Sequence, residues 1–175
     1  PTPMLYFATK ILNIPNGFMV TGSHNPKDYN GIKMIVGDNP LFDKDIYALR
    51  DWIANNIIEE VVNNDKPNIS SDIADKYIKR IKEDISINLE DKFVIDCMNG
   101  ITGSVIEKVT RAFNINAEFI NSSVDGNDPN YNPDPTKESN LEMLKEKIIE
   151  TCAAYGVAFD GDGDRLVIIK KNGDI

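Results

Sequence analysis

The sequence has few of the residues that build disulfides and zinc sites, and it has no long apolar run. Its 175 residues include two cysteines, one histidine and one tryptophan. Cys97 and Cys152 lack CxxC spacing and lie in apolar surroundings, so we expect reduced core thiols. No apolar run approaches the roughly 18 to 20 residues of a membrane helix, and a basic-then-apolar leader is missing. The sequence therefore predicts a cytoplasmic protein with no membrane partner.

Positive charge is also scarce. Lys and Arg total 19 against 28 Asp and Glu, and the resulting formal net charge of −9 is spread along the chain. This balance argues against a nucleic acid as the main partner. An anionic ligand would need a local basic pocket. The apolar share of 41% is enough for a buried core, so a disordered chain is not expected.

Both ends of the sequence look interrupted. Residues 1–12 (PTPMLYFATKIL) already have the pattern of a helix. Residues 165–170 (RLVIIK) predict a strand, and the Asn-Gly turn after it has no returning strand. We therefore expect a piece of a longer protein.

Apolar runs and periodicity predict an α/β fold made of two units. The first unit combines the helix at 1–12 with short strands at 18–20 and 32–36 and a helix that Asp43 caps. Its apolar residues recur at helical spacing: Ile46, Leu49, Ile53 and Ile57.

A polar segment around 63–71, which contains Pro67, marks the boundary, and a helix after Ser71 could bridge the two units. The second unit alternates a strand at 92–97, a helix at 102–113, a strand at 117–120, a helix around Leu141, Leu144 and Ile148, and a strand at 157–159. This βαβ order predicts two α/β domains, the first incomplete, each with a mixed, largely parallel sheet flanked by helices. We expect the domains at 1–68 and 89–175, with a linking helix at 69–88.

Three aspartates follow the last of these strands in the sequence DGDGDR. Asp160, Asp162 and Asp164 alternate with glycines that allow a tight turn, so their carboxylates can converge. Converging carboxylates repel one another unless a cation lies between them, and oxygen ligands suit Mg²⁺ or Ca²⁺. The loop is not an EF-hand, because Arg165 and Lys171 stand where that loop needs Gly and Glu. We expect a divalent metal site.

A second candidate loop, TGSHNP at 21–26, also follows a strand. Ser23, beside Gly22 and His24, could be a nucleophile or a phosphate carrier. The G-x-S-x-G elbow is absent and His24 is adjacent in sequence, so a Ser-His-Asp hydrolase is disfavoured.

Three segments in this order, TGSHNPKDYNGIK, VDGNDPNYNPDP and DGDGDR, resemble bacterial phosphomannomutase/phosphoglucomutase enzymes of the alpha-D-phosphohexomutase superfamily. The likeness runs from about Thr2 to the last residue. Within the four-domain family architecture, it implies that the chain holds the later part of domain 1 and essentially all of domain 2. Domains 3 and 4 would belong to the same polypeptide outside these residues. The loop that reads the sugar and the domain that clamps its phosphate would then be missing, so we expect the isolated chain to be inactive.

The resemblance implies a mutase that interconverts hexose 1-phosphate and 6-phosphate of mannose, glucose or both. Ser23 would carry the phosphoryl group, and hexose 1,6-bisphosphate would be intermediate and activator. One Mg²⁺ would bind the phosphoserine oxygen and the three aspartates. Arg165 would lie beside the phosphoserine, and Lys33 would act as acid or base with its pKa lowered. His24 would assist proton transfer or hold the loop.

Two alternatives remain open at this point. Phosphoglucosamine mutase belongs to the same superfamily, although its serine loop more often reads Ser-Ala-Ser-His-Asn-Pro. A catalytically inactive α/β module that keeps the metal site is the second alternative.

Overall fold

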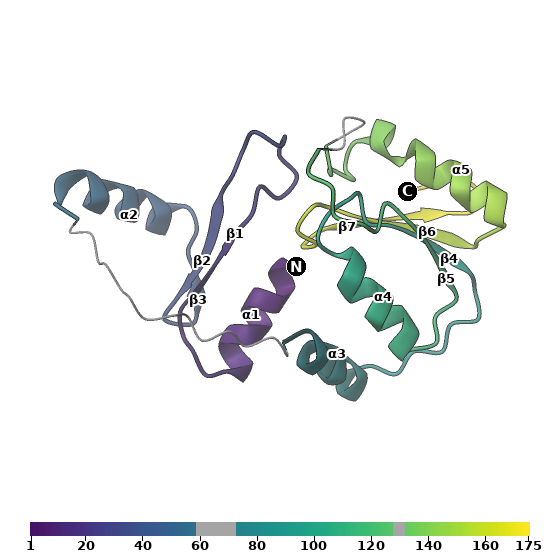
Figure 1. Cartoon of the computed structure of the whole chain (residues 1–175), viewed down its shortest axis with the longest axis horizontal. Helices are drawn as coiled ribbons and strands as arrows, with labels where there is room; N and C mark the ends of the chain where they lie inside the picture. The colour runs from purple at the N-terminus through teal and green to yellow at the C-terminus, as the bar shows by residue number, and fades with distance from the viewer. Residues whose placement is uncertain (59–72, 128–131) are drawn as a thin grey trace.

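The computed structural model describes residues 1–58, 73–127 and 132–175 and divides them between two β-sheets (Figure 1). We call residues 1–58 the first lobe and the later residues the second lobe. The first lobe contains α1 (Thr2–Ile11), β1 (Gly17–Val20), β2 (Ile32–Val36), β3 (Asn39–Pro40) and α2 (Lys44–Asn55). The second lobe contains α3 (Ile73–Asp84), β4 (Phe93–Asp96), α4 (Gly103–Ala112), β5 (Ala117–Ile120), the 3-10 turn η1 (Glu138–Leu141), α5 (Glu142–Thr151), β6 (Tyr155–Phe159) and β7 (Leu166–Lys170).

The first sheet is covered on one face only. Its strands pair antiparallel in the order β1-β2-β3. Helix α1 packs on one face, where Gly17 leaves room for the side chains of Leu5 and Thr9. Strand side chains alternate between faces, and on the other face Phe18 and Val20 are 70% and 63% exposed. Helix α2 buries none of its residues. Apolar surface of this lobe is therefore left uncovered.

The second sheet has the order β5-β4-β6-β7, with β4 parallel to both neighbours and β7 antiparallel at the edge. Helices α4 and α5 lie on opposite sides of it (Figure 1). Leu144 and Ile148 of α5 are buried with Val94 and Ile169 of the strands. Burial of each such side chain contributes about 1.5–3 kcal/mol. Because β4 and β6 are parallel, the residues that follow them meet at one edge of the sheet, which faces the first lobe (Figure 1).

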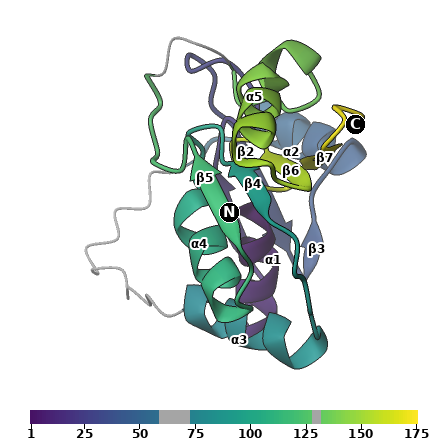
Figure 2. The same ribbon diagram turned by 90° about the vertical axis from the view of Figure 1, so that its right-hand side faces the viewer.

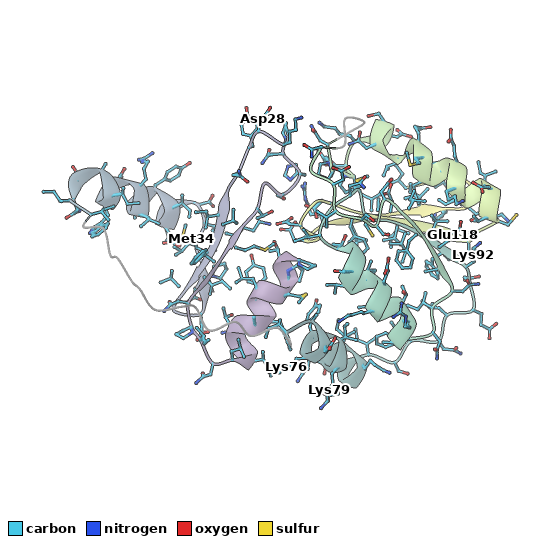
Figure 3. The ribbon with its side chains drawn as sticks, viewed as in Figure 1. Asp28, Met34, Lys76, Lys79, Lys92 and Glu118 are labelled. Carbon is cyan, nitrogen blue, oxygen red and sulfur yellow. The ribbon has the colours of Figure 1, made fainter. Side chains whose placement is uncertain are left out.

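The opposite edge of this sheet carries charge pairs. Lys92, just before β4, lies 2.9 Å from Glu118 of β5, and Figure 3 shows the two far from the first lobe. Lys147 of α5 lies 2.9 Å from the same glutamate.

Helix α3 of the second lobe contacts α1 of the first lobe as well as α4 of its own lobe (Figure 2). Its Tyr77 ring lies edge-on to Phe7 of α1, with centroids 5.2 Å apart. Its Asp75 pairs with Lys108 of α4 at 2.8 Å. The expected boundary segment around Pro67 lies outside the described residues, so the domain limits at 68 and 89 remain predictions.

Most expected elements are confirmed, as is the α/β class with a mixed, largely parallel sheet flanked by helices. That sheet is the second one. The described part of the first sheet is antiparallel, because β1 and β2 are joined by a returning loop and not by a crossover helix. No helix among the described residues is long and apolar enough to cross a membrane.

Several local predictions are wrong. Asp43 stands at the start of α2 but makes no capping hydrogen bond, because its backbone has a φ of 46°. Ile57 lies beyond the end of that helix. The strand β3 has only two residues and was not expected. Cys97 is a buried free thiol as predicted, but Cys152 is exposed, because it ends α5 in a left-handed conformation and leaves the core.

Candidate active site

The serine loop connects β1 to β2 and holds Ser23 in a left-handed conformation, with a φ of 52°. Such a backbone costs a non-glycine residue about 1–3 kcal/mol and persists where surrounding contacts enforce it. The amide of Ser23 donates to Oγ1 of Thr21 at 2.9 Å. Gly22 is required, because a Cβ there would lie 2.8 Å from the carbonyl oxygen of Tyr29. The loop therefore presents the serine in one orientation.

The aspartate loop connects β6 to β7 and brings three carboxylates together. One oxygen from each of Asp160, Asp162 and Asp164 lies within 4.8 Å of the others. Asp160 and Asp162 are almost completely buried. Gly163 has a φ of 70°, which favours glycine. Gly161 lets the loops approach each other, because a Cβ there would collide with the carbonyl oxygen of Ser23.

The serine hydroxyl lies among these carboxylates. Oγ of Ser23 is 3.1 Å from Oδ1 of Asp162 and 3.3 Å from Oδ2 of Asp160. It is also 3.1 Å from Nδ1 of His24. The structure thus brings together one hydroxyl of the first lobe and the carboxylates of the second. These are hard oxygen donors of the kind that Mg²⁺ prefers, and their crowding favours a cation between them.

Lys33 of β2 reaches across to the same loop. Its Nζ lies 2.7 Å from Oδ2 of Asp162 and 2.5 Å from Oδ2 of Asp164. Partial burial alone would lower the pKa of Lys33, but the hydrogen bonds to both aspartates outweigh it and raise the pKa. This direction is opposite to the lowered pKa expected from the sequence, because carboxylates surround the amine.

Arg165 holds Asp160 from within the aspartate loop. Its Nε and Nη2 both lie 3.2 Å from Oδ2, while the amides of Asp164 and Arg165 donate to Oδ1 at 3.1 Å. Burial, together with the charges of Asp162 and Asp164, nevertheless raises the pKa of Asp160.

The pKa of Asp162 shifts in the other direction. Burial raises it, but hydrogen bonds from Lys33 and Thr2 outweigh burial, so the net pKa is lowered. Two neighbouring carboxylates therefore differ in how readily they hold a proton.

A cavity of about 700 Å³ opens beside Ser23 between the lobes. Its lining includes Asn25 of the serine loop and Asn99, Asp125 and Asn132 of the second lobe. It offers polar groups next to the hydroxyl and has room for a small polar molecule.

All sequence-predicted site residues meet here, namely Ser23, His24, Lys33, Asp160, Asp162, Asp164 and Arg165.

Two further residues of the site were not predicted from the sequence. Thr2 is fully buried against Asp162, and Asp134 is a buried carboxylate that accepts hydrogen bonds from Thr136. Burial alone would raise the pKa of Asp134, but those bonds and the positive charges of His24 and Arg165 lower it. Its position in the Asn-Pro-Asp-Pro segment was the available signal.

Comparison with known proteins matches both lobes. The family model for phosphoglucomutase/phosphomannomutase, alpha/beta/alpha domain I matches residues 1–62, and that for domain II matches residues 75–173. A phosphomannomutase/phosphoglucomutase of Pseudomonas aeruginosa is 40% identical over the whole chain. A phosphoglucomutase of Neisseria gonorrhoeae is 36% identical over 99% of it.

Structural comparison gives the same family. The crystal structure of a phosphoglucomutase/phosphomannomutase family protein from Burkholderia thailandensis superposes with a TM-score of 0.86 and 35% identity over 99% of this chain. The chain spans 37% of the Pseudomonas protein, 38% of the Neisseria protein and 39% of the Burkholderia chain. Since the domain II model alone matches more than half of the residues, the chain belongs to the phosphoglucomutase/phosphomannomutase family.

Proposed function

We propose that the chain is the serine and metal-binding part of a hexose phosphate mutase that acts on a phosphosugar in the cytoplasm. The enzyme would interconvert hexose 1-phosphate and hexose 6-phosphate of mannose, glucose or both. One observation carries the proposal. A hydroxyl of the first lobe, on Ser23, lies within 3.3 Å of two carboxylates of the second lobe.

In the proposed reaction, Ser23 carries a phosphoryl group. A hydroxyl oxygen of the sugar phosphate attacks the phosphorus, the bond from phosphorus to Oγ of Ser23 breaks, and the sugar hydroxyl loses its proton to a base. The product is hexose 1,6-bisphosphate, which turns around in the site. Its other phosphoryl group then returns to Oγ, and the proton returns to the sugar oxygen that is released. The net change is an isomerisation.

The neighbouring side chains suit this chemistry. Lys33, 2.7 Å from Oδ2 of Asp162 and 2.5 Å from Oδ2 of Asp164, would take and return the proton once a cation on these aspartates offsets the carboxylate charge that raises its pKa. The guanidinium of Arg165 would hold phosphate oxygens, for which its planar fork is suited. His24, 3.1 Å from Oγ, would orient the serine or assist the proton. Mg²⁺ held by the three aspartates and the phosphoserine would neutralise charge on the transferring group.

The remainder of the polypeptide would complete the enzyme. We propose that residues 1–68 are the later part of domain 1, that 69–88 link the domains and that 89–175 form domain 2. Domains 3 and 4 would bind the hydroxyl groups of the sugar and its phosphate. The exposed Phe18 and Trp52 support further protein packing on the first lobe. The isolated chain would therefore be inactive.

The test is a coupled assay of the full-length gene product with Mg²⁺ and a trace of hexose 1,6-bisphosphate. The substrates are mannose 1-phosphate, glucose 1-phosphate and glucosamine 1-phosphate. Ser23→Ala should abolish turnover, whereas Ser104→Ala, an exposed serine of α4, should leave it unchanged. Preference for glucosamine 1-phosphate would identify a phosphoglucosamine mutase. Absence of activity on all three sugars would contradict the proposal and favour an inactive metal-binding module.

A further inference from the structure

Thr2, the first residue of α1, donates two hydrogen bonds to the aspartate loop. Its side chain is fully buried, and its hydroxyl donates to Oδ2 of Asp162 at 2.5 Å. Its backbone amide donates to the carbonyl oxygen of the same aspartate at 2.8 Å. Figure 1 shows the N-terminal end of α1 beside the turn between β6 and β7. Side-chain and backbone contacts thus join residues 160 positions apart.

The hydroxyl of Thr2 has one proton to give, and the carboxylate is its better acceptor. A thioether sulfur is a weak acceptor, and Sδ of Met19 lies 3.4 Å from Oγ1 of Thr2. The carboxylate is charged and much nearer, which makes a charge-assisted bond. The backbone contact serves a second purpose. The first amides of a helix have no partner within it, and the carbonyl of Asp162 supplies one.

The two oxygens of Asp162 have separate environments. Oδ2 accepts from Thr2 and from Lys33, whereas Oδ1 lies 3.1 Å from Oγ of Ser23. We infer that Thr2 is a positioning residue, which fixes Oδ2 so that Oδ1 faces the serine and the cation. The inference rests on the proposed function, because it assigns a cation to the aspartate loop.

Two donors hold Oδ2 of Asp162, and they differ in burial. The side chain of Lys33 is 28% exposed, whereas Thr2 is fully buried at the start of α1. The hydroxyl of Thr2 is therefore the more rigidly placed of the two donors. Asp160 does not need such help, because Arg165 and two loop amides already hold it.

The experiment measures Mg²⁺ binding by calorimetry to the full-length protein in one phosphorylation state, verified by intact mass. Thr2→Val removes the hydroxyl but keeps the branched shape, and Thr2→Ser keeps the hydroxyl. Thr9→Val is the matched control, because Thr9 is a buried threonine of the same helix whose hydroxyl donates to the carbonyl of Tyr6. Loss of a residue that orients a metal ligand typically weakens binding about 10- to 100-fold.

We expect at least about tenfold weaker Mg²⁺ binding for Thr2→Val, with Thr2→Ser and Thr9→Val close to wild type. In the mutase assay kcat should fall for Thr2→Val while KM for the sugar stays the same. A merely structural role would lower the melting temperature without moving Mg²⁺ affinity or kcat.

Unchanged Mg²⁺ affinity in a folded Thr2→Val protein would overturn the inference and leave the proposed function intact. If Thr2→Val does not fold, Thr2→Ala replaces it: an Mg²⁺ affinity at least about tenfold below that of Thr2→Ser supports the role of the hydroxyl, and equal affinity of the two variants overturns it. A wild-type protein that binds no Mg²⁺ would overturn the proposed function itself, and this inference with it.

Discussion

Oγ of Ser23 lies 3.1 Å from Oδ1 of Asp162, although 139 positions separate them in the chain. The contact joins a turn of the first sheet to a turn of the second. Each loop alone is a common polar turn. Together they form a site where a hydroxyl, three carboxylates, a lysine and an arginine can act on one phosphoryl group.

Lys33→Met should lower kcat of the full-length enzyme by about 10²- to 10⁴-fold, because it removes the proposed acid and base. Lys33→Arg should be nearly as slow, because a guanidinium stays protonated. Lys76→Met is the control, since Lys76 is an exposed lysine of α3 that lies outside the cavity. Steady-state assays at saturating sugar phosphate measure the effect. More than a third of wild-type kcat in Lys33→Met would rule out this role.

Lys33 should also stabilise the metal-free protein in a pH-dependent way. Its pKa is raised in the folded state by its two carboxylate partners. Its stabilising effect is then fully present below the unfolded pKa and is lost as the pH rises through the folded pKa. Melting curves without Mg²⁺ should show Lys33→Met below wild type at pH 7 to 9, with the difference shrinking at strongly alkaline pH. A difference that grows with pH would contradict this sign.

Asp160→Asn should raise the stability of the metal-free protein and weaken its binding of Mg²⁺. The raised pKa of Asp160 means that burial and its like-charged neighbours disfavour the ionised carboxylate at neutral pH. The amide removes that charge, so metal-free melting temperature should rise by a few degrees, at about 2–4 °C per kcal/mol. Mg²⁺ affinity should fall at least a hundredfold, because the substitution removes one of the metal's ligands. Turnover should fall by a similar factor, because a bound metal stabilises the charge of the transition state by several kcal/mol.

Asp91→Asn is the matched control for this substitution. Asp91 is an exposed aspartate two residues before β4 and lies outside the cavity. Neither melting temperature nor Mg²⁺ affinity should change. A fall in metal-free melting temperature for Asp160→Asn would show that the bonds from Arg165 outweigh the buried charge.

The two cysteines should differ in reactivity. Burial raises the pKa of Cys97 to about 11, so its reactive thiolate is scarce at neutral pH, and its side chain is inaccessible. Cys152 is exposed at the end of α5. Brief maleimide treatment of native protein, followed by peptide mapping, should label Cys152, with Cys97 labelled only after denaturation. Equal labelling of both in the native protein would contradict the packing of β4.

Local patterns predict the regular elements well. The buried strand β4 is predicted from one apolar run, and the aspartate loop from one run of alternating Asp and Gly. Neither prediction requires knowledge of the fold. The pairing of the serine loop with the aspartate loop came from the family resemblance and not from spacing. Thr2 could not be found in this way, because its burial depends on how α1 meets the loop after β6. Likewise the exposure of Cys152 follows from a backbone conformation at a helix end that apolar surroundings do not reveal.

The central claim is that Ser23 accepts a phosphoryl group, and peptide mass spectrometry tests it most directly. The full-length protein is treated with a phosphatase, incubated with hexose 1,6-bisphosphate and Mg²⁺, and digested. We expect that the peptide containing Ser23 gains one phosphoryl group on that residue, and that Asp162→Asn prevents the gain. Phosphate on another residue, or none while the wild type turns over hexose 1-phosphate, would contradict it.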